Sequence, residues 1–100
     1  MNAYIIVDIN VHNPEKFPEY IAKITPTVFA CGGRYLARGT NIDIVSGSWQ
    51  PKRIVVIEFP NVQIAQHWAN CAEYAPIHAL RNQYATANMI IVEGCPTPHS

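Results

Sequence analysis

The sequence feature that most constrains the fold is a strand-like run at residues 52–60. Positions 54–57 hold only β-branched residues and Phe59 is aromatic, a composition that favours a β-strand. Prolines at positions 51 and 60 bracket the run, and proline cannot donate a hydrogen bond to a sheet. One face of this strand carries Val55, Ile57 and Phe59, and the other carries Ile54 and Val56. Because both faces are apolar, both need cover, and we predict a central strand here.

The remaining pattern predicts strands and helices on either side of this strand. Apolar residues that alternate with a period of two predict strands at residues 3–11, 34–38 and 88–93. A helix interrupted by prolines is predicted at about residues 14–31, with Asn13 at its start and Gly32 at its end. Asn61 opens a second helix, Pro76 opens a short third one, and residues 42–45 are predicted as a short extension. This order predicts one ferredoxin-like α+β domain, a βαββαβ sandwich over residues 1–100.

In this topology the first and third strands pair antiparallel at the centre of a four-stranded antiparallel sheet, and the helices cover one face. The other face carries side chains that no helix covers, from Tyr4, Ile6, Ile54 and Val56. A large exposed apolar patch marks an interaction surface, and the simplest cover is the same face of a second copy. We therefore predict a homodimer through the helix-free sheet face.

The charge balance and hydropathy exclude several classes of partner. Seven Lys and Arg balance seven Asp and Glu, so a nucleic-acid partner is not expected. No apolar run approaches the roughly 20 residues of a membrane helix, and no signal peptide opens the sequence, so neither a membrane nor secretion is expected. Cys31, Cys71 and Cys95 are odd in number and widely spaced, which predicts free thiols in a cytoplasmic protein.

Motifs along nearly the whole chain resemble one bacterial family. They are Ala3-Tyr4 with Asp8, Pro14-Glu15 with Tyr20, Gly32-Gly33-Arg34-Tyr35-Leu36, Gly39, Gly47, Trp49-x-Pro51, Arg53, Glu58-Phe59-Pro60, Trp68, Glu73-Tyr74, Leu80-Arg81 and Val92-Glu93-Gly94. On these residues the chain resembles the family catalogued as domain of unknown function number 1330. The resemblance implies the dimeric α/β-barrel superfamily, in which two ferredoxin-like subunits pack sheet against sheet. Relatives there include cofactor-free monooxygenases, lactone isomerases and haem-degrading enzymes, but the resemblance brings no established reaction.

Two carboxylates are candidate catalytic groups. Asp8 and Glu58 both fall on the helix-free face of the two central strands. Pairing of Ile6 with Val56 would separate the two acids by about 13 Å along the sheet, too far to share a proton. Each acid is a candidate general base for a bound molecule. The alternative is structural, with each acid paired to Tyr4 or to an arginine across strands or subunits.

The candidate ligand-binding residues are Tyr4, Arg34, Trp49 and Arg53. A guanidinium group offers planar pairs of donors to an anion, so these two arginines and Arg38 could hold an anionic ligand. Ion pairs at the rim of the sheet are the alternative role for them. Trp49 falls on a loop, where it could cap a pocket or dock on a partner, whereas Trp68 is predicted to be a core residue.

No metal site and no cofactor are predicted. His67, Cys71 and His78 are close in the sequence, but a metal would need further ligands with convergent geometry. The chain shows no glycine-rich phosphate loop and no Ser-His-Asp or Cys-His signature. Two hypotheses stay open, because a fold does not fix a function. One is a pocket at the sheet face or dimer interior that binds or converts a small organic molecule. The other is a non-catalytic structural or ligand-binding homodimer.

Overall fold

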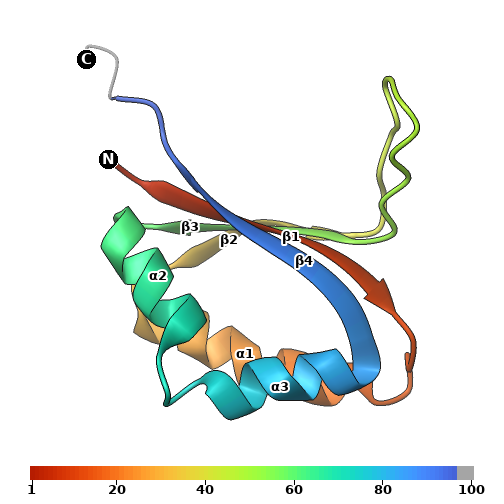
Figure 1. Ribbon diagram of the computed structural model, residues 1–100, viewed down its shortest axis with the longest axis horizontal. Helices are drawn as coiled ribbons and strands as arrows, with labels where there is room; N and C mark the ends of the chain where they lie inside the picture. Colours follow the sequence, from red (N-terminus) through yellow and green to blue (C-terminus); the bar gives the residue numbers. More distant parts are fainter. Residues whose placement is uncertain (97–100) are drawn as a thin grey trace.

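Alternating apolar residues form the four predicted strands, and these make one antiparallel sheet. In the computed structural model, which describes residues 1–96, the strands are β1 (Ala3–Val11), β2 (Arg34–Gly39), β3 (Ile54–Phe59) and β4 (Ala85–Glu93). Their order across the sheet is β2-β3-β1-β4, so β1 and β3 are the central pair. The helices are α1 (Phe17–Ala30), α2 (Val62–Asn70) and α3 (Ala75–Tyr84). All three lie on one side of the sheet (Figure 1), which confirms the predicted ferredoxin-like fold.

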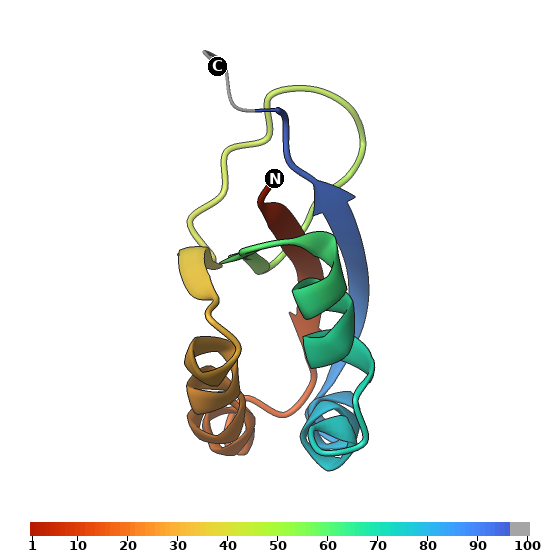
Figure 2. The same ribbon diagram turned by 90° about the vertical axis from the view of Figure 1, so that its left-hand side faces the viewer.

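The core lies between the sheet and this helix layer, in which α1 and α3 lie side by side (Figure 2). Trp68 of α2 is only 1% exposed, and its ring centroid lies 5.5 Å from that of Phe59. Its indole Nε1 is also satisfied, because it donates to Thr27 Oγ1 at 2.9 Å. The prediction that Trp68 belongs to the core is therefore confirmed.

Helix α1 begins later than predicted and is not broken by its prolines. Asn13 organises a turn before the helix, since its side chain accepts from the Lys16 N–H at 3.3 Å and its carbonyl accepts from the Phe17 N–H at 3.0 Å. The helix therefore starts at Phe17 instead of residue 14, and it continues through Pro26 in one piece. Gly32 follows with a φ of +77°, the left-handed conformation that ends a helix, as predicted.

The link between β2 and β3 projects from the side of the sheet opposite the helices (Figure 1). We call residues 40–52 the arm. The short extension predicted at residues 42–45 does not form a strand, because within residues 1–96 no other strand pairs with it. Val45 is 94% exposed and Trp49 is 61% exposed. The arm thus presents apolar side chains to solvent on the helix-free side.

The sheet register confirms the predicted pairing of the central strands, with Ile6 opposite Val56. The apolar residues of the helix-free face are Tyr4 and Ile6 from β1, Ile54 and Val56 from β3, and Ile90 and Val92 from β4. Strand β4 begins three residues earlier than predicted, because it pairs with β1 as far as Ala85 opposite Val11. Ile90 and Val92 are both exposed, so the face lacks cover along β4 as well.

Cys31, Cys71 and Cys95 are free thiols, as predicted. Within residues 1–96, no three His, Cys, Asp or Glu side chains are placed to hold a metal ion together. None of the described helices is long and apolar enough to cross a membrane.

Candidate functional site

Four of the predicted site residues form two pairs on the helix-free face. The indole Nε1 of Trp49 donates to Oδ2 of Asp8 at 3.0 Å, across 41 positions of sequence. The guanidinium Nε of Arg34 donates to Oε1 of Glu58 at 2.7 Å. Tyr4 lies opposite Glu58 in the register of β1 and β3. Each predicted catalytic acid is therefore held by a predicted ligand-binding residue.

The two pairs are separate from each other. They also differ in charge, because Asp8 is bonded to a neutral indole whereas Glu58 is paired with a cationic guanidinium. Asp8 and Glu58 lie on neighbouring strands but four positions apart along the sheet, about 13 Å at the rise of a strand. The Arg34 guanidinium, with smaller contributions from Asn2 and Tyr4, holds the pKa of Glu58 below its usual value of 4.5. A carboxylate with a lowered pKa is a weaker proton acceptor at neutral pH. The geometry thus suits Glu58 to a fixed charge more than to a general base.

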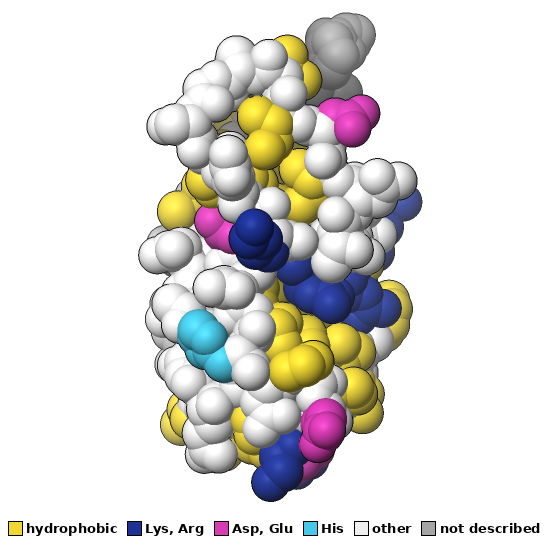
Figure 3. All heavy atoms as spheres, turned by 90° about the vertical axis from the view of Figure 1, so that its right-hand side faces the viewer, with side chains coloured by type: hydrophobic (Ala, Val, Ile, Leu, Met, Phe, Trp, Pro, Cys, Tyr) yellow, Lys and Arg dark blue, Asp and Glu magenta, His cyan; other side chains and the backbone are white. Residues whose placement is uncertain are grey.

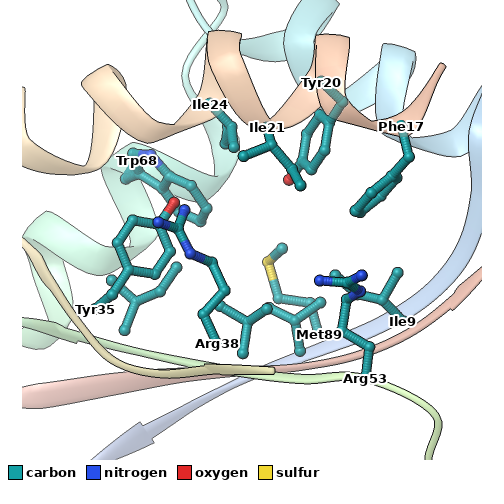
Figure 4. A pocket seen from close by; sticks show the side chains of 13 residues that line it. Ile9, Phe17, Tyr20, Ile21, Ile24, Tyr35, Arg38, Arg53, Trp68 and Met89 are labelled. Atoms are coloured by element: carbon teal, nitrogen blue, oxygen red, sulfur yellow. The ribbon is translucent and has the colours of Figure 1, made fainter. Parts of the chain in front are cut away.

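Arg53, the remaining predicted ligand-binding residue, lies on the opposite face of the sheet. There it lines a cavity between α1 and the sheet, which we call the α1–sheet cavity (Figure 4). Most of the wall is aromatic or aliphatic, with side chains that include Phe17, Tyr20, Ile21, Tyr35, Trp68 and Met89. The space left among these side chains is about 30 Å³, which is enough for one or two water molecules.

Two arginines enter this cavity, Arg38 from β2 and Arg53 from the position just before β3. The Cζ of Arg53 lies 5.3 Å from the ring centroid of Phe17, and its Nε is buried without a hydrogen-bond partner among the described residues. The Cζ of Arg38 lies 3.9 Å from the ring centroid of Tyr35. Arg38 Nη1 also donates to Thr25 Oγ1 at 2.9 Å, a bond that joins β2 to α1. Figure 3, which views the side where β2 ends and β3 begins, shows Lys and Arg side chains directly beside hydrophobic ones.

The Tyr20 hydroxyl adds a neutral polar group to the cavity, and Figure 4 shows it pointing from α1 toward the sheet. Burial raises the pKa of Tyr20 above its usual value of 10.0, and the nearby Arg81 opposes that rise. The phenol therefore stays protonated at neutral pH, and it can donate a hydrogen bond to an acceptor in the cavity.

A second hollow lies on the helix-free face, where the predicted pocket was placed. It is an open groove of about 320 Å³ between the arm and the central strands. Ile6 and Ile54 form its floor, and the arm contributes Ile42, Ile44 and Trp49 among others. Trp49 lines this groove and donates to Asp8, so one of the candidate catalytic acids lies beside the groove.

The α1–sheet cavity was missed at the level of sequence, although a signal for it is present. Arg53 lies two positions before Val55, so strand alternation places it on the helix-facing side. Arg38 also pairs with Val55, but it reaches that side through the register shift between Tyr35 and Ala37 in β2, which alternation along the sequence does not show. A charged residue is seldom buried without a partner, so Arg53 on a core-facing surface marks a place that the core does not fill.

Solved structures of three proteins share this fold at low sequence identity. RPA0582, a protein of unknown function from Rhodopseudomonas palustris, is 14% identical with a TM-score of 0.74, over 96% of this chain and 84% of that chain. SnoaB, a cofactor-independent oxygenase from Streptomyces nogalater, is 11% identical with a TM-score of 0.66, over 96% and 95%. An antibiotic biosynthesis monooxygenase is 16% identical with a TM-score of 0.56, over 96% and 100%. These likenesses show the ferredoxin-like fold of the chain and nothing about its activity.

Among curated proteins, none matches the sequence significantly. The sequence does match a family described as "Domain of unknown function (DUF1330)" over residues 2–95. The match spans all four strands and all three helices, and it is the family that the motifs of the sequence resemble. The chain therefore belongs to the DUF1330 family.

Proposed function

We propose that this protein binds a small organic molecule in the α1–sheet cavity. The observation that carries the proposal is the buried Nε of Arg53, which has no hydrogen-bond partner in the described chain and lies at a mostly apolar cavity. Ligand sites in proteins are mostly apolar hollows with a few placed polar groups. Phe17, Tyr35 and Trp68 supply apolar surface here, and Arg53 and the Tyr20 hydroxyl supply the polar groups.

An organic ligand requires the cavity to widen. The present space of about 30 Å³ is far below the roughly 150 Å³ of a cavity that accepts benzene. Two lining side chains are suited to move. Met89 is unbranched and adaptable, and Arg38 is an exposed side chain held across the cavity by its bond to Thr25. Rotation of Arg38 away from Thr25 would open the cavity without a change in the backbone.

We also propose that the protein acts as a homodimer joined through the helix-free face. The support is the row of apolar side chains on that face, of which Ile90 and Val92 are exposed, together with the apolar arm beside it. Contiguous apolar residues on an uncovered sheet face are typical of an interaction surface. In such a dimer the groove beside the arm would be enclosed, and the Asp8 and Glu58 pairs would lie at or near the contact.

Conversion of the ligand is a second candidate function. SnoaB, which shares the fold, is described as a cofactor-independent oxygenase, and this motivates an assay for oxygen consumption. A catalytic role for Asp8 or Glu58 would require the substrate to lie on the helix-free face, because both acids are on that face. The alternative is a homodimer that binds without catalysis. The location of the ligand therefore tells whether these two acids can act on it, and the oxygen assay separates conversion from binding alone.

The test is a thermal-shift screen of small organic molecules on the wild-type protein and on Ile21→Trp, which would fill the cavity. The matched control is Ala22→Trp, an exposed neighbour on the same helix that does not line the cavity. We expect hits that raise the Tm of the wild type and of Ala22→Trp but not that of a folded Ile21→Trp. Hits that survive Ile21→Trp and vanish in Asp8→Asn or Glu58→Gln would instead place the ligand on the helix-free face. An oxygen electrode then tells whether any hit is oxidised.

A further inference from the structure

We infer that the ligand of the α1–sheet cavity is an organic anion, specifically a small aromatic carboxylate, whose charged group binds Arg53 and Arg38. The inference rests on the proposed function, and it adds the chemical class of the ligand. Four features of the cavity support it: its net charge, the unpartnered donor of Arg53, the position of Arg38, and the aromatic walls.

The charged side chains that line the cavity are all positive. Its lining includes the guanidiniums of Arg38 and Arg53 and no carboxylate. Among the described residues, the ion pairs are Lys23 with Glu19 and Arg34 with Glu58, so neither cavity arginine is neutralised by an acid. Two positive charges beside a poorly hydrated apolar space attract an anion more strongly than they would in water.

Arg53 has a free donor at the place where an anion would bind. Its guanidinium stands beside the Phe17 ring, and the buried Nε lacks an acceptor among residues 1–96. A buried donor without a partner is costly, and a bound carboxylate would remove that cost. The planar fork of an arginine also matches the two oxygens of a carboxylate better than a single neutral oxygen.

Arg38 links anion binding to opening of the cavity. At present its Nη1 donates to the hydroxyl of Thr25, which itself donates to the Ile21 carbonyl at 2.7 Å. A carboxylate is a stronger acceptor for a guanidinium than a neutral hydroxyl is. An anion bound next to Arg38 would therefore draw its guanidinium away from Thr25 and widen the cavity next to Ile21.

The apolar walls of the cavity indicate what the uncharged part of the ligand should be. Apart from the arginines and the Tyr20 hydroxyl, the lining is aromatic or aliphatic, with Phe17, Tyr35 and Trp68 around the space. Aromatic rings favour stacked or edge-on contacts with another ring. A second charged group on the ligand would meet no opposite charge in these walls, so a monocarboxylate fits better than a dicarboxylate.

The test compares matched acids and neutral amides as probes: benzoate with benzamide, and 1-naphthoate with 1-naphthamide. Affinity is measured by titration calorimetry or by NMR shifts on wild type, Arg53→Gln, Arg38→Gln and Lys52→Gln. Lys52 is the control, because it is exposed, adjacent to Arg53 and absent from the cavity lining. We expect wild type and Lys52→Gln to prefer the acid by about tenfold, as for one charge-assisted contact. Arg53→Gln should lose that preference while its affinity for the amide is kept.

Several outcomes would overturn the inference. Equal affinity for acid and amide in the wild type would do so, as would an unchanged preference in both Arg53→Gln and Arg38→Gln. Arg38→Gln serves if Arg53→Gln does not fold, since Arg38 is exposed. If acids and amides bind equally and Ile21→Trp removes both, the anion inference fails while the proposed cavity stands. If no probe and no screened molecule binds in a way that depends on Ile21, both fail together.

Discussion

The indole of Trp49 donates to the carboxylate of Asp8 at 3.0 Å and so fastens the exposed arm to the central strand β1. Trp49 is mostly exposed. Within residues 1–96, its hydrogen bond to Asp8 is the side-chain bond that joins the arm to the sheet. The bond has a charged acceptor, which makes it stronger than a bond between neutral groups. It gives the long link between β2 and β3 a defined position over the helix-free face.

We predict that Trp49→Phe and Asp8→Ala each loosen the arm while the rest of the fold is kept. The expected result is faster cleavage by a non-specific protease within residues 42–50, since the arm has no ladder bonds of its own and a loosened loop is cut more readily. The loss of stability should be small, about 1 kcal/mol, because the bond is largely exposed to solvent. Limited proteolysis measures the first effect and urea titration the second. Unchanged cleavage in both variants would show that the bond does not hold the arm.

A second prediction concerns Trp68. Trp68→Ala should lower the free energy of unfolding by about 3–5 kcal/mol, because the side chain is 1% exposed and packs on Phe59. Trp49→Ala is the control within the same chain, since it removes the same side chain from an exposed position. Urea denaturation followed by circular dichroism measures both. Similar losses in the two variants would contradict the packing described for Trp68.

Lowering the pH should reduce the stability of the fold through protonation of Glu58. Its pKa is lowered from the usual 4.5 in the folded protein, mainly by the bond from Arg34. A carboxyl group with a lowered pKa adds stability above its unfolded value, and that stability is lost as the pH falls through the folded value. We expect Tm to fall below about pH 4.5, and Arg34→Gln should reduce this part of the decline. A pH series of melting curves for both proteins makes the comparison.

His78 should produce a separate decline at higher pH. Burial lowers its pKa from the usual 6.5, and its ring stands edge-on to Trp68 at a centroid distance of 4.8 Å. Below pH 6.5 the unfolded chain therefore takes up the proton first, so stability falls as the pH drops from 6.5 toward the lowered folded value. His78→Gln should remove this slope and leave the decline near pH 4.5. A slope that persists in His78→Gln would assign it to another group.

The fold could be predicted in detail where local patterns determined it. The period-two alternation around Ile6 and Val56 assigned the residues of the central strands to the two faces of the sheet, and the glycines after α1 marked its end. The pattern failed where tertiary pairing decides. Residues 42–45 alternate like a strand but find no partner, whereas Ala85 pairs with β1 despite its low strand propensity.

The candidate site was harder to predict than the fold. The sequence places Asp8 and Glu58 on the helix-free face but does not show that each already has a partner. It also does not show that the core stays open beside Arg53. That cavity depends on how α1 packs over the sheet, which involves residues far apart in the chain. The helix-facing position of Arg53 was the available clue.

The last prediction is the dimer. Charge in the middle of the helix-free face, as in Ile6→Lys or Val56→Glu, should dissociate the protein and lower its Tm together. Each fully apolar side chain on this face gains roughly 1.5–3 kcal/mol when it is buried, and a domain has only about 5–15 kcal/mol of net stability. Loss of the contact should therefore be visible in both measurements, light scattering for mass and calorimetry for Tm.

Ala79→Lys is the control for charge, since it adds a lysine at an exposed position of α3 in the helix layer. We expect this variant to keep both the mass and the Tm of the wild type. A wild-type protein that is a stable, fully folded monomer at micromolar concentration would falsify the dimer. The apolar residues of the helix-free face, Ile6 and Ile90 among them, would then be expected to bind a different partner, because an exposed apolar patch marks an interaction surface. The α1–sheet cavity would be unaffected by that result, since it is built from one chain and lies on the other side of the sheet.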